Sequence, residues 1–382
     1  MSSLSQTRSL TPPAVFSTWQ LATTPTGPPI QIVARRHLDS LRDQHNNGKA
    51  SGPKTVILPD GSRYEGNFVN GEPSGIGTLT CPNGDSYVGN FVNGIPSGKG
   101  KRTLPNGTVY EGDVVNGIPS GKGKHTRPNG DSYEGNFVNG NLPGEGKLTY
   151  SNRNYYEGHF VNNEPSGQGK LTYSNGNYYE GHFENGEPSG QGKLTFPDGR
   201  YYEGDFVDGA PSSGKGKFTF PDGGCYEGDF VNDKASGKGK FTFADRSYYE
   251  GDFVNGTPSG TGKLTLTSGD YYEGDFYSGN PSGIGKFTFA DTDKHFYEGQ
   301  FFYGKPSGTG KLTLASGAYY EGEFLSGIPS GKGKVTLANG VCSESNFENG
   351  RQDKLTTTQE TFSIKPNLNR SKKIPETLNF GI

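Results

Sequence analysis

Tyr202-Glu203-Gly204-Asp205-Phe206-Val207-Asp208-Gly209 is one copy of a motif that recurs along most of this 382-residue chain. The tyrosine that opens each copy stands at residues 64, 87, 110, 133, 156, 179, 202, 226, 249, 272, 297 and 320. The spacing is 23 residues, apart from one step of 24 and one of 25. A thirteenth copy, 343–350, begins with serine instead of tyrosine. Repetition at a near-fixed period predicts an array of stacked units rather than conventional globular domains.

The composition fits such an array. With 62 glycines and only 29% hydrophobic residues, the chain cannot fill a conventional layered core. A repeat array escapes this limit because each unit need only cover its neighbours. The 22 Tyr and 24 Phe are the main apolar material available for these contacts.

Each repeat predicts two β-strands, one through Tyr-Glu-Gly-x-Phe and one through Gly-x-Gly-Lys-Leu-Thr-Phe. Asn-Gly and Asp-Gly between repeats, as at Asp198-Gly199, suit two-residue type I′ hairpin turns. Asn-Gly-x-Pro-Ser-Gly within a repeat predicts a longer loop. Short connections force consecutive strands to pair antiparallel. We therefore expect an all-β fold, an elongated single-layer antiparallel meander of about twelve β-hairpin repeats, roughly 120 Å long, over residues 52–350.

Counting each opening tyrosine as position 1, the strand period of two places positions 1, 3 and 5 on the same face as positions 12, 14, 16 and 18. These positions are tyrosine, glycine, phenylalanine and leucine, and we predict that they form the core, with glycine beneath the large rings. The opposite face, called the polar face below, carries Glu at position 2 and Lys at position 15. Cross-strand ion pairs are expected there, such as Glu203 with Lys217 and Glu250 with Lys263.

The string Tyr-Glu-Gly-x-Phe-x-x-Gly-x-x-x-Gly-x-Gly, repeated over about 55–350, resembles the MORN repeat family. This chain departs from the family pattern at position 5, where Phe replaces a frequent Trp, and at Val88 and Val114, which replace Glu and Phe. The resemblance implies an elongated antiparallel sheet that serves as a scaffold, targeting or dimerisation module. Relatives often attach the array to a catalytic domain, for which the flanks of this array are too short.

The two flanks have a different character. Residues 1–51 are rich in Ser, Thr and Pro and are predicted to be largely disordered. A short helix at 30–45 is expected within them, either as a basic amphipathic segment for a membrane or partner, or as a cover over the first edge of the array. Residues 351–382 are predicted to be a flexible basic tail.

Charge argues against one class of function, and cysteine content indicates the cellular compartment. Residues 1–57 carry a net charge of +4, residues 351–382 of +3, and the body between them of −10, which is not typical of a nucleic-acid-binding protein. Three widely separated cysteines suggest a reduced compartment. With no apolar leader or membrane span in the sequence, we expect a cytoplasmic protein, either free or peripheral to a membrane or a cytoskeletal structure.

Nothing in the sequence predicts catalysis, a cofactor or a metal site. The glycine-rich strings, such as Gly260-Thr261-Gly262-Lys263, lack the order of a phosphate-binding loop. His159 and His182 fall at the same position of adjacent repeats, about 10 Å apart, which is too far for a shared metal. An active site is a singular constellation, whereas every candidate side chain here recurs in each repeat. We therefore expect a protein that is not an enzyme.

The leading hypothesis is a scaffold that binds a protein partner. From the fifth repeat onward, position 0, the residue before the repeat tyrosine, is usually aromatic, and position 4 is often aspartate. The expected contact residues are Tyr155, Tyr178, Tyr201, Tyr248, Tyr271, Phe296, Tyr319, Asp205, Asp229, Asp252 and Asp275. Exposed tyrosines beside acids suit a partner with basic and aliphatic groups. The alternative explanation is that tyrosine simply favours strands.

The second hypothesis is recruitment to anionic phospholipids such as phosphoinositides. Residues 87–130 are basic within an acidic body. The expected contacts are Lys99, Lys101, Arg102, Lys122, Lys124 and Arg127. Solvated surface lysines are the competing explanation. Pairing of the aromatic face with a second copy of the chain, as a homodimer, is a further expectation.

Overall fold

The structure, a computed structural model, describes residues 51–58, 60–290 and 295–352. These residues form 27 β-strands and no helix. They fall into two compact units, which are described separately. The first contains the residues up to 197 together with 206–210, and the second contains 198–205 together with the residues from 211 onward. The helix expected at 30–45 and almost all of both predicted tails lie outside the described residues.

The strand bounds follow the repeat. The strands of the first unit are β1 (Gly52–Ile57), β2 (Arg63–Val69), β3 (Glu72–Thr80), β4 (Ser86–Val92), β5 (Ile95–Thr103), β6 (Val109–Val115), β7 (Ile118–Thr126), β8 (Ser132–Phe137), β9 (Gly144–Thr149), β10 (Tyr155–Val161), β11 (Glu164–Thr172), β12 (Tyr178–Glu184) and β13 (Glu187–Thr195). Residues of β14 (Tyr201–Val207) and β15 (Ala210–Thr219) belong to both units. The other strands of the second unit are β16 (Cys225–Val231), β17 (Lys234–Thr242), β18 (Tyr248–Val254), β19 (Thr257–Thr265), β20 (Tyr271–Tyr277), β21 (Asn280–Thr288), β22 (Phe296–Phe302), β23 (Lys305–Thr313), β24 (Tyr319–Leu325), β25 (Ile328–Thr336), β26 (Cys342–Glu348) and β27 (Arg351–Gln352).

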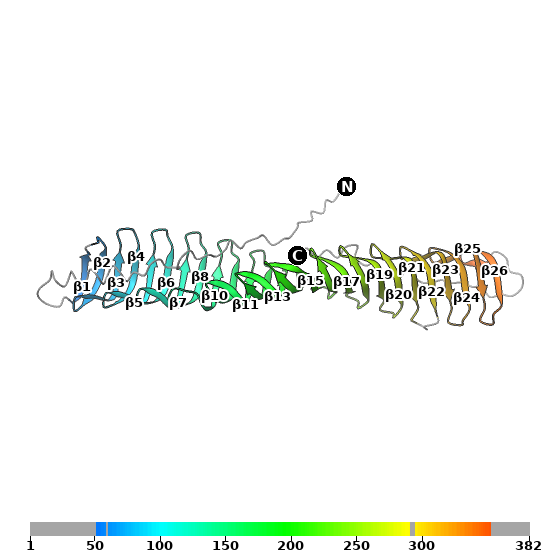
Figure 1. The fold of residues 1–382 in the computed structure, drawn as a ribbon, viewed down its shortest axis with the longest axis horizontal. Helices are drawn as coiled ribbons and strands as arrows, with labels where there is room; N and C mark the ends of the chain where they lie inside the picture. The colour runs from blue at the N-terminus through cyan, green and yellow to red at the C-terminus, as the bar shows by residue number, and fades with distance from the viewer. Residues whose placement is uncertain (1–50, 59, 291–294, 353–382) are drawn as a thin grey trace. The chain divides into compact units, whose positions relative to one another are not determined.

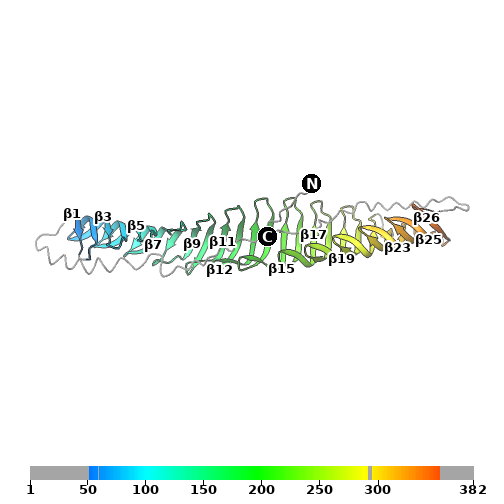
Figure 2. The ribbon, with the colours of Figure 1, turned by 90° about the horizontal axis from the view of Figure 1, so that it is seen from above.

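Each unit is an antiparallel meander. In the first unit every strand pairs with the next one along the chain, from β1–β2 to β12–β13. In the second unit the same holds from β15–β16 to β26–β27. Figures 1 and 2 show this succession of hairpins from two directions within each unit. The predicted all-β meander of hairpin repeats is confirmed.

The turns differ from the prediction, because the tight hairpin lies within the repeat. Val254 pairs with Thr257, so only Asn255 and Gly256 lie between the strands, with φ of 51° and 83°. Two positive φ values in a two-residue loop define a type I′ turn. Between repeats the turn is longer, since Thr265 pairs with Tyr271 across five residues and only Gly269 has positive φ. The type I′ turn expected between repeats was therefore wrong.

The core face is built on the repeat tyrosine, which is at most 3% exposed in all twelve full repeats. The ring of Tyr249 lies over Gly251 and Gly262, where an added Cβ atom would overlap the phenol. Its hydroxyl donates a hydrogen bond of 3.0 Å to the carbonyl of Asp252. The prediction that glycine makes room beneath the rings is confirmed.

An edge-to-face ladder of rings connects the repeats. Tyr249 contacts Phe253 of its own repeat at 5.2 Å between ring centroids and Phe276 of the next repeat at 4.7 Å. The same two contacts recur along both units, for example around Tyr156 and Tyr297. Val114 interrupts the ladder, because a valine stands where both Tyr87 and Tyr110 would meet a phenylalanine.

The two ends of the array lack these inner features. In β1, Pro53 and Lys54 occupy positions 13 and 14, the second of which is glycine in the inner repeats. In β26, Ser343 and Ser345 replace the tyrosine and glycine of positions 1 and 3. Proline, lysine and other polar residues at sheet edges discourage further strand pairing.

We expect Val114→Phe to stabilise the first unit, since it would complete the ladder between Tyr87 and Tyr110. Each edge-to-face contact contributes about 0.5–1.5 kcal/mol beyond area burial. The free energy of unfolding should therefore rise by about 1–3 kcal/mol for the two contacts, measured by urea denaturation. Val115→Phe, on the exposed side of the same strand, is the matched control and should change little. A loss of stability in Val114→Phe would show that the site has no room for the ring.

The core tyrosines also predict alkaline unfolding. Burial raises the pKa of Tyr179 and of Tyr202 from 10.0 to about 12. A pKa raised in the folded state means that the stabilisation is fully present below pH 10 and is lost as the pH rises towards 12. We expect β-sheet circular dichroism and tyrosinate absorbance to change together in this interval. Ionisation of these rings without loss of the sheet signal would contradict this expectation.

Candidate functional site

The polar face is organised as predicted by strand alternation. In β18, Tyr249 and Phe253 are buried, whereas Tyr248, Glu250 and Asp252 lie on the other side of the sheet. The same alternation of burial recurs in the first strand of nearly every repeat. Positions 0, 2, 4 and 6 therefore form rows that run from hairpin to hairpin, about 10 Å apart.

A lysine, an aromatic ring and a glutamate form a recurring unit on this face. Lys263 Nζ lies 2.9 Å from Glu273 Oε1 and 4.0 Å from the centre of the Tyr271 ring. The same arrangement occurs for Lys147 with Tyr155 and Glu157, Lys170 with Tyr178 and Glu180, Lys240 with Tyr248 and Glu250, Lys286 with Phe296 and Glu298, and Lys311 with Tyr319 and Glu321. The hydrogen bond that the Lys263 ammonium donates to Glu273 raises the pKa of Lys263, which keeps the ammonium charged.

The ion pairs cross from one repeat to the next, which corrects the expected pairing within a repeat. Glu250 lies opposite Lys263 in the sheet, but Lys263 pairs with Glu273, and Lys217 pairs with Glu227 at 2.6 Å. The ring at position 0 explains why Lys263 pairs with Glu273 rather than Glu250. The Lys263 ammonium lies over the Tyr271 ring, which belongs to the same strand as Glu273. These pairs are roughly half exposed, so each contributes only about 0.2–1 kcal/mol.

The predicted aromatic row lies on the polar face, but its rings are not free. All seven residues from Tyr155 to Tyr319 in this row are half-buried. In six of them a lysine covers one ring face at 3.8–4.1 Å from the centroid. A partner would meet the ring edges together with the Lys–Glu pairs. Sequence reasoning missed the covering lysine, although position 15 follows from the same alternation.

Two of the four predicted aspartates, Asp252 and Asp275, also have partners within the sheet. A β-bulge between Gly251 and Phe253 leaves Thr261 opposite no residue of β18. The Thr261 N–H donates instead to the Asp252 carboxylate at 3.0 Å, and Lys238 pairs with the same carboxylate at 2.7 Å. The hydrogen bond from Lys238 lowers the pKa of Asp252 below its usual value. Asp275 accepts the Ile284 N–H in the same way, at 3.0 Å.

The aspartate at position 4 thus stabilises the sheet by accepting a backbone hydrogen bond, and this role can be tested by substitution. We expect Asp252→Ala to lower the free energy of unfolding by about 0.5–1.5 kcal/mol, because the Thr261 N–H loses its acceptor. Asp252→Asn, the matched control, keeps an acceptor and should restore most of that loss. Chemical denaturation of the intact chain measures both values. Equal stability of the alanine and asparagine variants would show that the hydrogen bond contributes nothing.

The six basic residues proposed for lipids divide between the two faces of the sheet. Lys99, Lys101, Lys122 and Lys124 lie on the polar face, whereas Arg102 and Arg127 occupy core-face positions 16 and 18. Arg102 is buried and pairs with Asp85 at 2.6 Å. On the polar face, Lys99 pairs with Asp113 at 3.1 Å and Lys101 with Glu111 at 3.9 Å.

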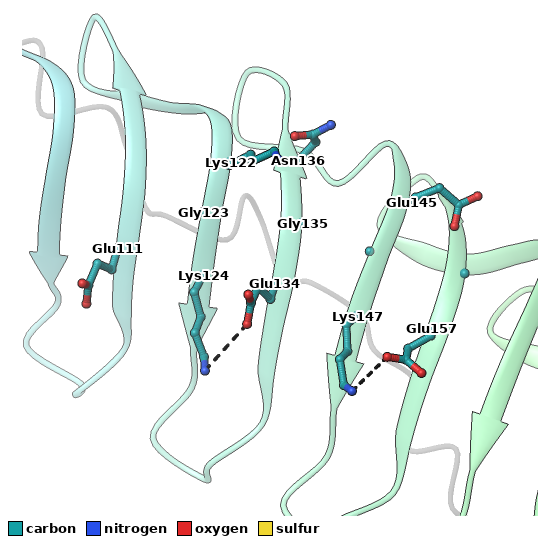
Figure 3. Close-up of a pocket in the computed structure, with 12 residues that line it drawn as sticks. Glu111, Lys122, Gly123, Lys124, Glu134, Gly135, Asn136, Glu145, Lys147 and Glu157 are labelled. Carbon is teal, nitrogen blue, oxygen red and sulfur yellow. Dashed lines mark hydrogen bonds and ion pairs between the residues drawn. The ribbon is translucent and has the colours of Figure 1, made fainter.

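An open hollow of about 960 Å³ lies over the polar face of β6 to β10 (Figure 3). Four glutamates and three lysines line it, and Figure 3 shows the pairs Lys124–Glu134 and Lys147–Glu157 spanning neighbouring strands. The opposite charges nearly balance, so the hollow is not a cationic pocket.

A row of exposed apolar residues at position 6 was missed by sequence reasoning. These side chains lie beside the tight turns and are 46% to 67% exposed. The row consists of Val69, Val92, Val115, Val138, Val161, Val207, Val231, Val254, Tyr277, Phe302 and Leu325. Following the alternation two residues beyond the aspartate would have found this row, since position 6 belongs to the polar face yet is apolar in eleven of thirteen repeats.

Within residues 51–58, 60–290 and 295–352, no group of three His, Cys, Asp or Glu side chains is placed to hold a metal ion. No helix in those ranges is long and apolar enough to cross a membrane.

Comparison with known families gives one match, to the model described as MORN repeat. It matches residues 64–86, 87–109, 110–132, 133–155, 156–178, 179–199, 202–225, 226–248, 249–271, 272–294, 297–319 and 320–342. These twelve segments begin at the twelve repeat tyrosines. No curated protein sequence matches this chain.

Similar solved structures are distant. The TCP domain of Drosophila melanogaster SAS-4, solved with a proline-rich motif of Ana2, is 17% identical, with 41% of this chain and 85% of that one covered and a TM-score of 0.28. The TCP10 domain of Danio rerio CPAP is 16% identical, with 58% and 94% covered and a TM-score of 0.27. Virginiamycin B lyase of Staphylococcus aureus is 9% identical, with 79% and 86% covered and a TM-score of 0.12. Likenesses this weak support no functional inference.

Proposed function

This chain belongs to the MORN-repeat family, and we propose that it is a non-catalytic scaffold that binds a segment of a partner protein along the polar face of its sheet. The main support is the regular repetition of surface chemistry. Chemically similar side chains recur on many of the hairpins, so the face offers several equivalent contacts rather than the singular constellation that catalysis needs.

The observation that carries the proposal is the lysine–aromatic–glutamate unit, present in six repeats. Because the ion pairs are roughly half exposed, replacing one with a contact to a partner costs only about 0.2–1 kcal/mol. The rings beneath are held in place by the sheet, so little side-chain entropy is lost when a partner covers their edges. A partner segment can thus exchange weak internal pairs for contacts at several successive hairpins.

The cellular location is part of the same proposal. Cys81 and Cys225 are half-buried, Cys342 is exposed, and all three are free thiols. Free thiols suit a reducing compartment, and we place the scaffold in the cytoplasm. Binding to anionic lipids stays an untested alternative, because the six basic residues divide between two faces and those on the polar face mostly pair with acids.

Replacing three neighbouring rings tests the proposal. In the variant Tyr248→Ser, Tyr271→Ser and Phe296→Ser, the second unit loses three neighbouring contact edges and three cation–π contacts. We expect loss of the partner that the intact chain captures from native lysate at moderately high salt, read by mass spectrometry. The free energy of unfolding should fall by roughly 0.5–1 kcal/mol for each ring.

Replacement of Tyr155 and Tyr178 by serine is the matched control, because it removes the same contacts from the first unit. It shows whether one unit or both bind the partner. Retention of the same stoichiometric partner by both ring variants would overturn the proposal. Flotation of the intact chain with anionic vesicles, abolished by salt, would favour the lipid alternative instead.

A further inference from the structure

The turns of the last three full hairpins of the second unit carry a compact apolar cluster, which we name the tip strip. Its residues are Tyr277, Phe302, Tyr303, Leu325 and Ile328. Four of the five are 58% to 67% exposed. Leu325 and Ile328 face each other across one turn, and the Phe302 and Tyr303 rings lie 4.6 Å apart at the turn before it. The strip is therefore two side chains wide at these two turns.

Tyr303 has the clearest sign of a role beyond folding. Its φ is 47°, in the left-handed region that favours glycine and asparagine, and asparagine holds the matching position in most repeats, for example at Asn255. A tyrosine in that region is strained, and strain at an exposed residue is typical of functional sites. The sheet thus keeps an unfavourable, exposed aromatic residue next to Phe302.

We propose that the tip strip binds an acidic amphipathic helix of another protein. Successive hairpins are two strands apart, which spaces the strip side chains at roughly 9.6 Å. A helix advances about 10.5 Å in seven residues, so one heptad fits one hairpin. In its narrowest apolar stripe a helix presents two apolar side chains per heptad, which matches the width of the strip. An extended segment would alternate its side chains between opposite faces and cannot match both dimensions.

Charge favours an acidic helix at the middle turn, which carries Lys305, whereas Asp275 and Glu323 lie on the same face two residues before Tyr277 and Leu325. Lys305 is the only charged residue in the three turns 277–280, 302–305 and 325–328, and it is exposed without an ion pair to another described residue. The turns of the first unit, in contrast, carry Glu72, Glu164, Glu184, Glu187 and Asp208 and no Lys or Arg. A second copy of this chain fits less well, since a two-fold axis through the middle turn of the strip would bring two Lys305 side chains together.

The strip and the aromatic row lie at opposite ends of the same strands, at positions 6 and 0 of the polar face, so this inference does not depend on the proposed function. The probe is a synthetic three-heptad helix with leucine at the two core positions of each heptad and glutamate beside them. Its twin has lysine in place of every glutamate. We expect the intact chain to bind the acidic peptide about tenfold or more tightly than the lysine twin, as measured by fluorescence anisotropy.

Substitutions in the intact chain locate the site. Phe302→Ser with Leu325→Ser should weaken acidic-peptide binding about tenfold or more. Val92→Ser with Val115→Ser, at the same repeat position in the first unit, is the matched control and should leave binding unchanged. Tyr303→Asn should weaken binding and raise the melting temperature together, because asparagine relieves the strained backbone. A purely structural tyrosine would not give this opposite pair of effects.

Three outcomes would overturn the inference. The first is equal binding of the two peptides, and the second is unchanged binding by the strip variant. The third is dimerisation of the intact chain that Phe302→Ser with Leu325→Ser abolishes, measured by sedimentation without peptide, because a second copy would then occupy the strip. The ring variant Tyr248→Ser, Tyr271→Ser and Phe296→Ser should still bind the acidic peptide, which separates a failure here from a failure of the proposed function.

Discussion

The packing of one tyrosine over two glycines is the contact on which each repeat depends. In the repeat of Tyr249, the ring occupies the space above Gly251 and Gly262 and meets two phenylalanines at its edges. A side chain at either glycine would displace the ring, and displacement would break the contact with the next repeat. The high glycine content and the low hydrophobic content of the chain both follow from this arrangement. Each repeat needs two glycines beneath its tyrosine and only a few large apolar side chains around the ring.

The same contact sets the chemistry of the opposite face. Holding the glycine strands close together produces the bulge after position 3, and the bulge frees an amide that the side chain at position 4 binds in several repeats. Alternation then fixes the aromatic residue, glutamate and lysine in parallel rows. The polar face is thus rigidly patterned but weakly bonded, which suits exchange of its contacts with a partner.

Strand pairing, core face and repeat bounds could be predicted from the sequence. The 23-residue repeat fixes where each strand lies, and the alternation of side chains along a strand fixes which of them face the core. The turns could not be assigned by dipeptide alone: Asn-Gly forms the type I′ turn at Asn255 but only a single positive φ at Asn106-Gly107. Ion-pair partners also escaped prediction, since Lys263 faces glutamates on both neighbouring strands and the Tyr271 ring decides between them. Arg102 was expected on the surface because arginine is mostly exposed, although its position 16 belongs to the core face.

The interrupted ladder at Val114 has a consequence for how the array loses its structure. In a linear array, stability is a sum over units and the contacts between neighbours, and cooperativity passes only through those contacts. The third repeat contributes fewer ring contacts than any full repeat around it, so it is a natural boundary between cooperative blocks. Repeats one and two then form a short terminal block that can open and close while the longer block beyond Val114 stays folded.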